Sequence, residues 1–183
     1  GSGSVLLGAN ANAGLVTDWY SNPTGGSILL GGTGTFSFNT PSITGTTTYY
    51  VESRDTITGC ISSSRTAVVA TINPLPVLST SGTVTAVCFS TANQSTTLPY
   101  LSSSSPVSYS IDWSAAANQA GLTDQSTTAF VFAAGAGTVT GIVIPGNTAA
   151  GTYAGVMSIA SSNGCVSTSN ISSTINALPT VPV

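Results

Sequence analysis

The sequence contains neither histidine nor lysine, and charged residues of all kinds make up 4% of it. Without these two residue types, the chain alone cannot assemble the Ser–His–Asp, Cys–His or Ser–Lys arrangements that activate a nucleophile. Hydrolysis by a serine or cysteine nucleophile is therefore excluded from the expected activities. We predict that the chain is not an enzyme.

Basic charge is scarce as well, because two arginines stand against five acidic residues and the net charge is −3. Nucleic-acid binding needs clustered basic side chains that neutralise phosphates, and anionic lipid attracts polybasic segments. The sequence also lacks an apolar run of about 20 residues, the length that crosses a bilayer. We expect no nucleic-acid partner and no direct membrane insertion.

Acidic residues are the remaining candidates for chemistry. Glycoside hydrolysis would need two carboxyls facing each other across a cleft. Asp18 and Asp112 instead precede a tryptophan at matching places in the two halves of the chain, which favours a structural role for both. Calcium prefers several oxygens from one loop, and only Glu52 and Asp55 lie close enough in sequence to share an ion. A calcium ion at a module junction stays open as an alternative, and no other metal or cofactor is expected.

One group of charges is predicted to share a surface. A hairpin with Asp55 opposite Cys60 turns Cys60 toward the interior. Glu52, Arg54 and Arg65 then fall on the outer face. We expect them to form a solvated cluster, worth about 0–1 kcal/mol per ion pair.

Serine, threonine, valine, isoleucine and tyrosine are abundant, and this mixture suits half-buried strands better than helices. Hydrophobic residues make up 41% of the chain, so we expect buried cores rather than disorder. Glycines punctuate short predicted strands, which indicates a sandwich rather than a βαβ fold. Residues 114–121, which include an alanine run, are the one stretch expected to form a helical turn.

A weak internal repeat divides the chain, whose 183 residues suffice for two immunoglobulin-sized domains. Each half ends with a tyrosine-bearing strand, a turn containing Thr58-Gly59 or Asn163-Gly164, and a returning strand that opens at a cysteine. Both returning strands stop near a proline, which cannot donate to a strand ladder. We place the boundary at Pro76, giving one module over residues 1–76 and a second over residues 77–183.

Each half also carries one tryptophan in a predicted strand, over residues 16–20 and 107–113. Alternation in the second strand puts four residues on one face: Val107, Tyr109, Ile111 and Trp113. Because sandwiches usually bury the tryptophan of a central strand, we expect Trp19 and Trp113 in two cores. The alternative is that Trp19 and Trp113 form a carbohydrate-stacking platform.

Several short motifs follow one another in a similar order along both halves. The first half has Asp18-Trp19-Tyr20, Thr24-Gly25-Gly26, residues 46–52 and Gly59-Cys60, and the second has Val87-Cys88-Phe89-Ser90, residues 110–113, Gly151-Thr152-Tyr153 and Asn163-Gly164-Cys165. In this order they resemble the immunoglobulin-like and PKD-like repeat modules of giant Bacteroidetes surface proteins, including the gliding-motility adhesins of flavobacteria. The resemblance covers nearly the whole chain. It implies an all-β fold of two tandem immunoglobulin-like antiparallel β-sandwiches.

The resemblance also implies a location and a role. Such proteins are exported through the type IX secretion system and displayed on the cell surface, where the modules serve as structural spacers or in adhesion and gliding. The implied partners are neighbouring repeat modules of the same chain, with a surface polysaccharide or an abiotic surface as further candidates. In addition, Thr56 lies in an Asp-Thr-Ile sequence that matches the pattern for general O-glycosylation in Bacteroidetes.

Three cysteines are present, without the spacing or the histidines of a zinc site. In an exported protein, we expect Cys88 and Cys165 to form a disulfide that closes a loop of about 77 residues and contributes roughly 4 kcal/mol. The similar modules begin with a cysteine before a glycine-rich first strand, whereas this chain begins Gly1-Ser2-Gly3. The resemblance therefore predicts a shortened first strand and Cys60 as an unpaired thiol.

Two other functions fit parts of the sequence. One is suggested by five aromatic residues: Trp19, Tyr20, Tyr49, Tyr50 and Tyr100. They would suit carbohydrate-binding accessory modules of a secreted polysaccharide hydrolase. Threonine-rich stretches such as residues 46–48 suggest an ice- or mineral-binding surface, but no regular Thr-x-Thr ladder supports that function.

Overall fold

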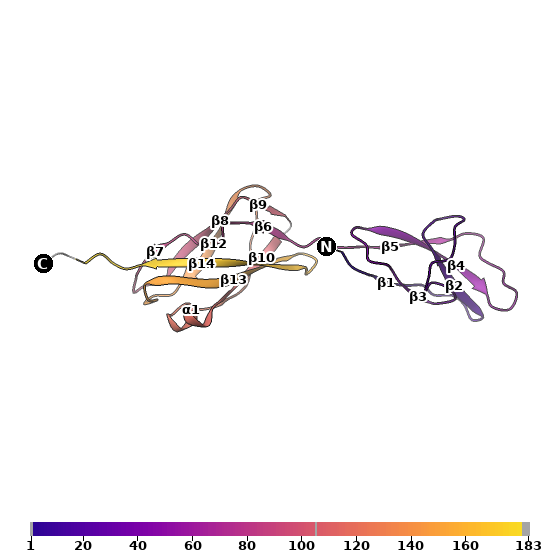
Figure 1. Cartoon of the computed structure of the whole chain (residues 1–183), viewed down its shortest axis with the longest axis horizontal. Coiled ribbons are helices and arrows are strands. Elements are labelled where there is room, and N and C mark those ends of the chain that lie inside the picture. The colour runs from indigo at the N-terminus through magenta and orange to yellow at the C-terminus, as the bar shows by residue number, and fades with distance from the viewer. Residues whose placement is uncertain (1, 105, 181–183) are drawn as a thin grey trace. The chain divides into compact units, whose positions relative to one another are not determined.

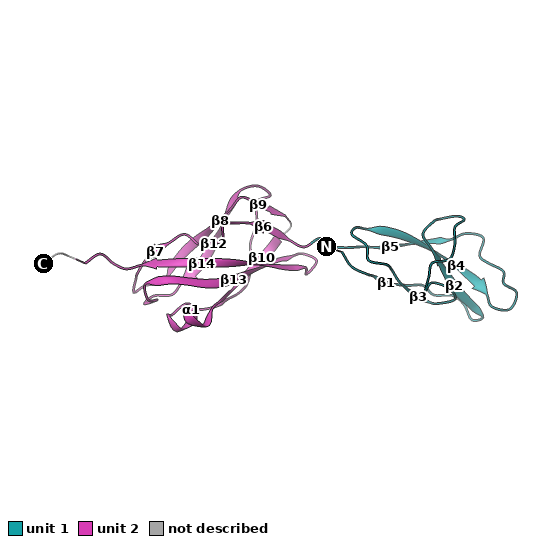
Figure 2. Cartoon of the chain, in the orientation of Figure 1, with its two compact units in different colours: residues 1–74 teal, residues 75–183 magenta. Residues whose placement is uncertain are grey.

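The computed structural model describes residues 2–104 and 106–180, in which strands are connected by loops and one short helix (Figure 1). The chain divides into two compact units, residues 1–74 (unit 1) and 75–183 (unit 2), drawn in different colours in Figure 2. This division falls two residues before the boundary expected at Pro76. The all-β sandwich class predicted from the composition is confirmed.

Unit 1 is built from a three-stranded and a two-stranded antiparallel sheet. The larger sheet has the order β2-β4-β5, and the smaller pairs β1 with β3. The strands are β1 (Leu6–Gly8), β2 (Leu15–Tyr20), β3 (Ser37–Asn39), β4 (Thr47–Asp55) and β5 (Thr66–Ala70).

The core of unit 1 is small and aromatic, and residues of both sheets contribute to it. Trp19 of β2 stacks on Phe38 of β3 with ring centroids 5.8 Å apart, and Phe38 meets Tyr49 of β4 edge-on at 5.5 Å. Gly32 closes one side, because a Cβ there would lie 2.8 Å from the Cβ of Trp19. Only a glycine therefore lets this loop approach the tryptophan.

The hairpin predicted in unit 1 is present, but its two arms pair in two registers. Near the turn, Arg54 lies opposite Ile61, whereas further along Val51 lies opposite Thr66. Between these two pairs the returning arm advances by five residues while β4 advances by three. The two extra residues of the returning arm therefore loop out. Cys60 is exposed on this irregular arm, so the expectation that it faces inward is wrong.

Unit 2 contains a five-stranded sheet of order β11-β10-β13-β14-β7 and two two-stranded sheets, β12-β8 and β6-β9. All pairings are antiparallel except that of β14 with β7, which is parallel. The elements are β6 (Val77–Ser79), β7 (Val87–Cys88), β8 (Gln94–Tyr100), β9 (Ser102–Ser104), β10 (Pro106–Trp113), α1 (Ala115–Gln119), β11 (Gln125–Ala129), β12 (Gly137–Ile144), β13 (Gly151–Ser161) and β14 (Val166–Asn176).

The core of unit 2 is larger and mostly aliphatic. Among the described residues its buried members are Leu78, Val84, Leu98, Tyr100, Tyr109, Ile111, Trp113, Ala117, Leu122, Val139, Ile142, Ile144, Met157, Ile159, Ile171 and Ile175. The predicted hairpin forms β13 and β14, and its turn is closed by the Ser161 N–H donating to the Cys165 carbonyl.

Strand β10 follows the predicted alternation except at its first residues. Tyr109, Ile111 and Trp113 are buried, but Val107 is 45% exposed. The pairing with β13 shifts register between Pro106 and Ser108, and this irregularity turns Val107 outward. The expectation that Val107 shares the core face is therefore wrong.

The predicted helical turn is confirmed as α1, which connects β10 to β11 (Figure 1). Ser114 caps its start, because the Ser114 hydroxyl accepts a hydrogen bond from the Ala117 N–H at 3.3 Å. Ala117 is the buried residue of the helix and packs into the core of unit 2. The helix is one element of the scaffold.

Candidate functional site

Four charged side chains of unit 1 form a connected polar cluster, here called the charge lattice: Asp18, Glu52, Arg54 and Arg65. Asp18 lies on β2 directly opposite Glu52 on β4. Two adjacent carboxylates repel each other unless each has a counter-ion. Arg54 pairs with Asp18 at 2.6 Å and Arg65 pairs with Glu52 at 3.0 Å.

In the ion pair of Asp18 and Arg54, the carboxylate is buried and the guanidinium is partly exposed. The side chain of Asp18 is 1% exposed and that of Arg54 is 31% exposed. The guanidinium donates to both carboxylate oxygens, and the Gly34 N–H donates to Oδ1 at 2.8 Å. The hydrogen bond from Arg54 is the main reason why the pKa of Asp18 lies below its usual value, although burial opposes it.

The second pair includes an aromatic partner. The Tyr20 hydroxyl donates to Glu52 Oε1 at 2.5 Å, and the Arg65 guanidinium lies 3.2 Å from the centre of the Tyr20 ring. Burial raises the pKa of the Tyr20 hydroxyl, and the hydrogen bond to Glu52 raises it further. Arg65 also donates to the Asn22 and Gly25 carbonyls, at 2.9 and 2.6 Å, and thereby fixes the loop after β2.

This geometry corrects the expectation of a solvated cluster. Glu52 is 6% exposed and Arg65 is 10% exposed. The register prediction placed the two arginines near Glu52, but it missed Asp18, which is 36 residues from Arg54 in sequence. No local pattern signals that pairing, because it depends on β2 lying beside β4.

The other three carboxylates have separate positions. Asp55 accepts hydrogen bonds from the Ile57 and Thr58 N–H groups, both at 2.8 Å, and these bonds lower its pKa. Asp124 accepts from the Trp113 N–H at 2.8 Å. Asp112 is exposed and makes no hydrogen bond or ion pair with the described residues. The described residues contain no group of three or more His, Cys, Asp or Glu side chains arranged to hold a metal ion.

Most of the proposed stacking residues are buried. Trp19 is 0% and Trp113 is 2% exposed, so both lie in the cores. The tyrosines Tyr20, Tyr49 and Tyr100 are 6%, 6% and 4% exposed. Tyr50 alone of the six is partly accessible, and one ring does not make a platform. The carbohydrate platform expected as an alternative is therefore not formed.

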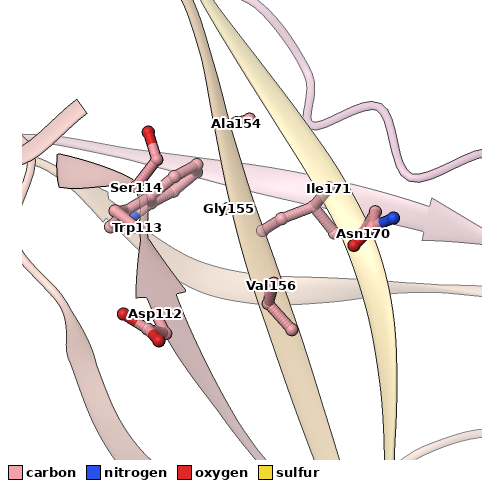
Figure 3. Close-up of a pocket in the computed structure, with 8 residues that line it drawn as sticks. All are labelled: Asp112, Trp113, Ser114, Ala154, Gly155, Val156, Asn170 and Ile171. Atoms are coloured by element: carbon pink, nitrogen blue, oxygen red, sulfur yellow. The ribbon is translucent and has the colours of Figure 1, made fainter. Parts of the chain in front are cut away.

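An open cavity of about 440 Å³ lies on the five-stranded sheet of unit 2 (Figure 3). Asp112, Val156 and Asn170 lie next to one another across β10, β13 and β14 and line it. Gly155 is closely backed by Trp113, since a Cβ there would lie 2.6 Å from the indole Cε3. The cavity offers one carboxylate, one amide and the Ser114 hydroxyl for hydrogen bonding, but its lining residues include no second titratable group.

The cysteines do not pair as predicted. Cys88 on β7 lies beside Asn176, whereas Cys165 precedes the opposite end of β14. Eleven residues of extended strand, about 35 Å, separate these positions, whereas a disulfide needs Cα atoms within about 7 Å. The expected Cys88–Cys165 disulfide is therefore wrong, and Cys88 is an exposed free thiol. Cys60 is also an exposed free thiol.

Thr56, the residue expected to carry a glycan, is exposed in the turn after β4. Its hydroxyl donates to the Gly14 carbonyl at 3.1 Å. The oxygen that a glycan would modify is thus at the surface but already serves as a hydrogen-bond donor. Separately, none of the helices in the described residues is long and apolar enough to span a membrane.

Comparisons with known proteins identify the type of unit 1. Residues 1–74 match the family model described as an Ig-like domain, CHU_C associated, so unit 1 is an Ig-like module. No curated protein matches the chain in sequence.

Two solved structures resemble the chain at low sequence identity. Fibronectin(III)-like modules of CbhA from Clostridium thermocellum are 10% identical with a TM-score of 0.42, over 95% of this chain and 86% of that one. The SGBP-B protein of the Bacteroides ovatus mixed-linkage glucan utilization locus, solved with a mixed-linkage heptasaccharide, is 12% identical with a TM-score of 0.28. That match covers 95% of this chain but 64% of the other, less than two thirds of its length. Neither likeness bears on what this chain binds.

Proposed function

We propose that the chain is a non-catalytic structural segment of an exported surface protein, in which it spaces or supports neighbouring modules. The observation that carries this proposal is that nearly all the charged side chains bind groups of their own unit. Six of the seven charged side chains are bound to other groups of the same unit, in the charge lattice, a turn or a backbone hydrogen bond. An acid–base pair needs two available carboxyls, and Asp112 alone is available.

The surface supports the same function. With few charges and a covering of serine and threonine, the chain has no strong field for steering a charged ligand. Of the tryptophans and tyrosines considered for a sugar platform, five of the six are buried. Display on the bacterial surface, with repeat modules as neighbours, is the setting that the Ig-like family of unit 1 suggests. Attachment and gliding motility are the processes in which such a spacer would act.

An exchange experiment in the host organism tests the spacer role. Residues 1–183 are replaced by two unrelated β-sandwich domains of similar length within the protein that carries them, and surface display and attachment are measured. A spacer is replaceable, so both should persist. Loss of attachment with display intact would contradict the spacer role and show that this segment carries an adhesive site.

A carbohydrate-binding role is the second candidate, and the cavity on unit 2 favours it. Asp112 and Asn170 offer hydrogen-bonding groups that a sugar hydroxyl can use, beside the apolar side chain of Val156. A glycan array with the purified chain tests this candidate, with Asp112→Ala as the variant and Asp55→Ala, in a distant turn, as the matched control. Binding lost in Asp112→Ala alone would support the role, and no binding by the unchanged chain would eliminate it.

A further inference from the structure

Residues 82–89, which follow the short first strand β6 of unit 2, run parallel to its last strand, β14. Val87 and Cys88 of β7 pair with Ile175 and Asn176 of β14, and Thr83 forms a parallel bridge further back. The contact therefore extends from residue 82 to residue 89. Figure 1 shows β7 beside the end of β14 where the strand leaves the unit.

Backbone hydrogen bonds join the two segments along this length. The Ser172 N–H donates to the Gly82 carbonyl at 2.7 Å, and the Val84 N–H donates to the Ser172 carbonyl at 2.8 Å. At the other end, the Phe89 N–H donates to the Asn176 carbonyl at 2.8 Å. Gly82 permits the approach, because its φ is +74° and a Cβ there would lie 2.4 Å from the Asn170 carbonyl oxygen.

The segment is also anchored on its other side and beneath. The Thr85 N–H donates to the Thr97 carbonyl of β8 at 2.7 Å, and Gln94 Nε2 donates to the Cys88 carbonyl at 2.8 Å. Val84 is 0% exposed and belongs to the core. Residues 82–89 are thus held between β14 and β8, and they cannot leave β14 without breaking a second set of contacts.

The three-residue first strand β6 pairs with β9, so tension on the start of unit 2 reaches residue 82 through that short pair. The parallel pairing of residues 82–89 with β14 then determines how the unit responds to tension. Tension applied to the ends of unit 2 pulls residue 82 backward along its strand and Asn176 forward along its own. In a parallel pair these directions are opposite and lie along the strands, so all the hydrogen bonds between the segments are loaded together. An antiparallel hairpin pulled at its open end instead loses its bonds one at a time.

Unit 1 has no such arrangement among its described residues. Its first strand, β1, pairs antiparallel with β3, and its last strand, β5, pairs with β4 alone. The first and last strands therefore lie in different sheets with no ladder between them. Tension on the ends of unit 1 is not resisted by a shared set of hydrogen bonds.

We propose that the pairing of residues 82–89 with β14 is a mechanical clamp that lets unit 2 carry tension between its ends, while unit 1 yields first. This inference rests on the proposed structural role and specifies which unit bears load. Resistance to force is measured on the purified chain, whereas replaceability is measured in the host. Failure of one test is therefore distinguishable from failure of the other.

Single-molecule force spectroscopy on the whole chain, tethered at its two ends, tests the clamp. The units release different lengths of chain: unit 1 has 74 residues and unit 2 has 109, or roughly 250 Å and 370 Å of extended chain before the folded length is subtracted. Forced unfolding is governed by the unfolding rate. We expect the short release at low force, followed by the long release at clearly higher force. Long releases at forces no higher than the short ones would overturn the proposal.

A matched pair of variants tests the hydrogen bonds themselves. Ser172→Pro removes the N–H that donates to Gly82, whereas Ser172→Ala removes the same hydroxyl and keeps the N–H. The proline variant should unfold unit 2 at lower force, and the alanine variant should behave as the unchanged chain. Equal forces for the two variants, both folded by circular dichroism, would contradict the clamp.

A change in pulling direction keeps the test independent of whether the proline variant folds. The Ser167 hydroxyl donates to the Pro76 carbonyl at 2.6 Å, so the start of β14 lies beside the beginning of unit 2. Tethers at Leu75 and Ser162, through cysteines introduced into a chain whose three native cysteines are serines, peel the strands instead of shearing them. The unfolding force of unit 2 should fall below its end-to-end value. An equal force in both directions would overturn the proposal.

Discussion

Replacing Asp18 with asparagine removes a buried charge while keeping the shape of the side chain. Asp18 is 1% exposed and receives hydrogen bonds from Gly34 and, twice, from Arg54. Loss of one member of a buried ion pair usually costs about 3–5 kcal/mol, because the partner charge stays uncompensated. Since Arg54 is 31% exposed and can turn toward water, we expect a smaller loss, about 2 kcal/mol of the unfolding free energy of unit 1.

Urea unfolding followed by tryptophan fluorescence measures this loss. Each unit contains one buried tryptophan, Trp19 or Trp113, so both units report on their own unfolding. For a small domain with an m-value of about 1–2 kcal/mol/M, the transition of unit 1 should move down by about 1–2 M urea. The transition of unit 2 should stay in place, and hydrogen exchange assigns each transition to its unit.

The chain provides a matched control, because Asp112 also precedes a tryptophan but is exposed and unpaired among the described residues. Asp112→Asn should change stability by no more than about 0.5 kcal/mol. A shift for Asp18→Asn no larger than this control would refute the reasoning. Combining Asp18→Asn with Arg54→Gln completes a cycle, whose coupling energy should be at least about 0.5 kcal/mol if the two side chains act as a pair.

Three further outcomes are expected. The pKa of Asp18 in the folded chain lies below its usual value of 3.8, so the stabilisation that its charge gives unit 1 is present above about pH 4. This stabilisation fades as the pH falls through the folded-state pKa. In Asp18→Asn, the part of the acid-induced loss of unfolding free energy that Asp18 causes should therefore be absent. Gly82→Ala should destabilise unit 2 by about 2–4 kcal/mol in urea unfolding, through a positive φ and a clash with a carbonyl, whereas Gly135→Ala, which meets nothing within 4 Å, should be nearly neutral. Thiol reagents should modify Cys60 and Cys88 in the folded chain, and a Cys60 or Cys88 that reacts only after denaturation would contradict their exposure.

The distribution of charge between the units has a physical reason. Unit 1 has a core of six buried residues, against sixteen in unit 2, counted over the described residues. A domain of this size buries a smaller fraction of its surface and gains less from hydrophobic contact. The charge lattice joins β2, β4 and the segment before β5, and it fixes a loop that the small core does not reach. Five of the seven charged residues accordingly belong to unit 1.

Local features of the sequence predicted a large part of this fold. Composition and alternation indicated strands, the repeated Gly–Cys turns located both hairpins, and the tryptophans identified the strands that enter the cores. These predictions succeed because strand pairing across a tight turn and burial of a large aromatic ring depend on neighbouring residues. The proline at which we placed the module boundary lies two residues after the end of unit 1.

The tertiary structure alone decided which distant residues meet. The pairing of Asp18 with Arg54 and the separation of Cys88 from Cys165 both follow from the order of strands in a sheet, which no short pattern encodes. The same holds for Val107, turned outward by a register shift, and for the parallel contact of residues 82–89 with β14. Sequence by itself determined the strands and their hairpins because those contacts are local. Sheet order and register determined the charge lattice, the free thiols and the clamp because those contacts join residues that are far apart in the chain.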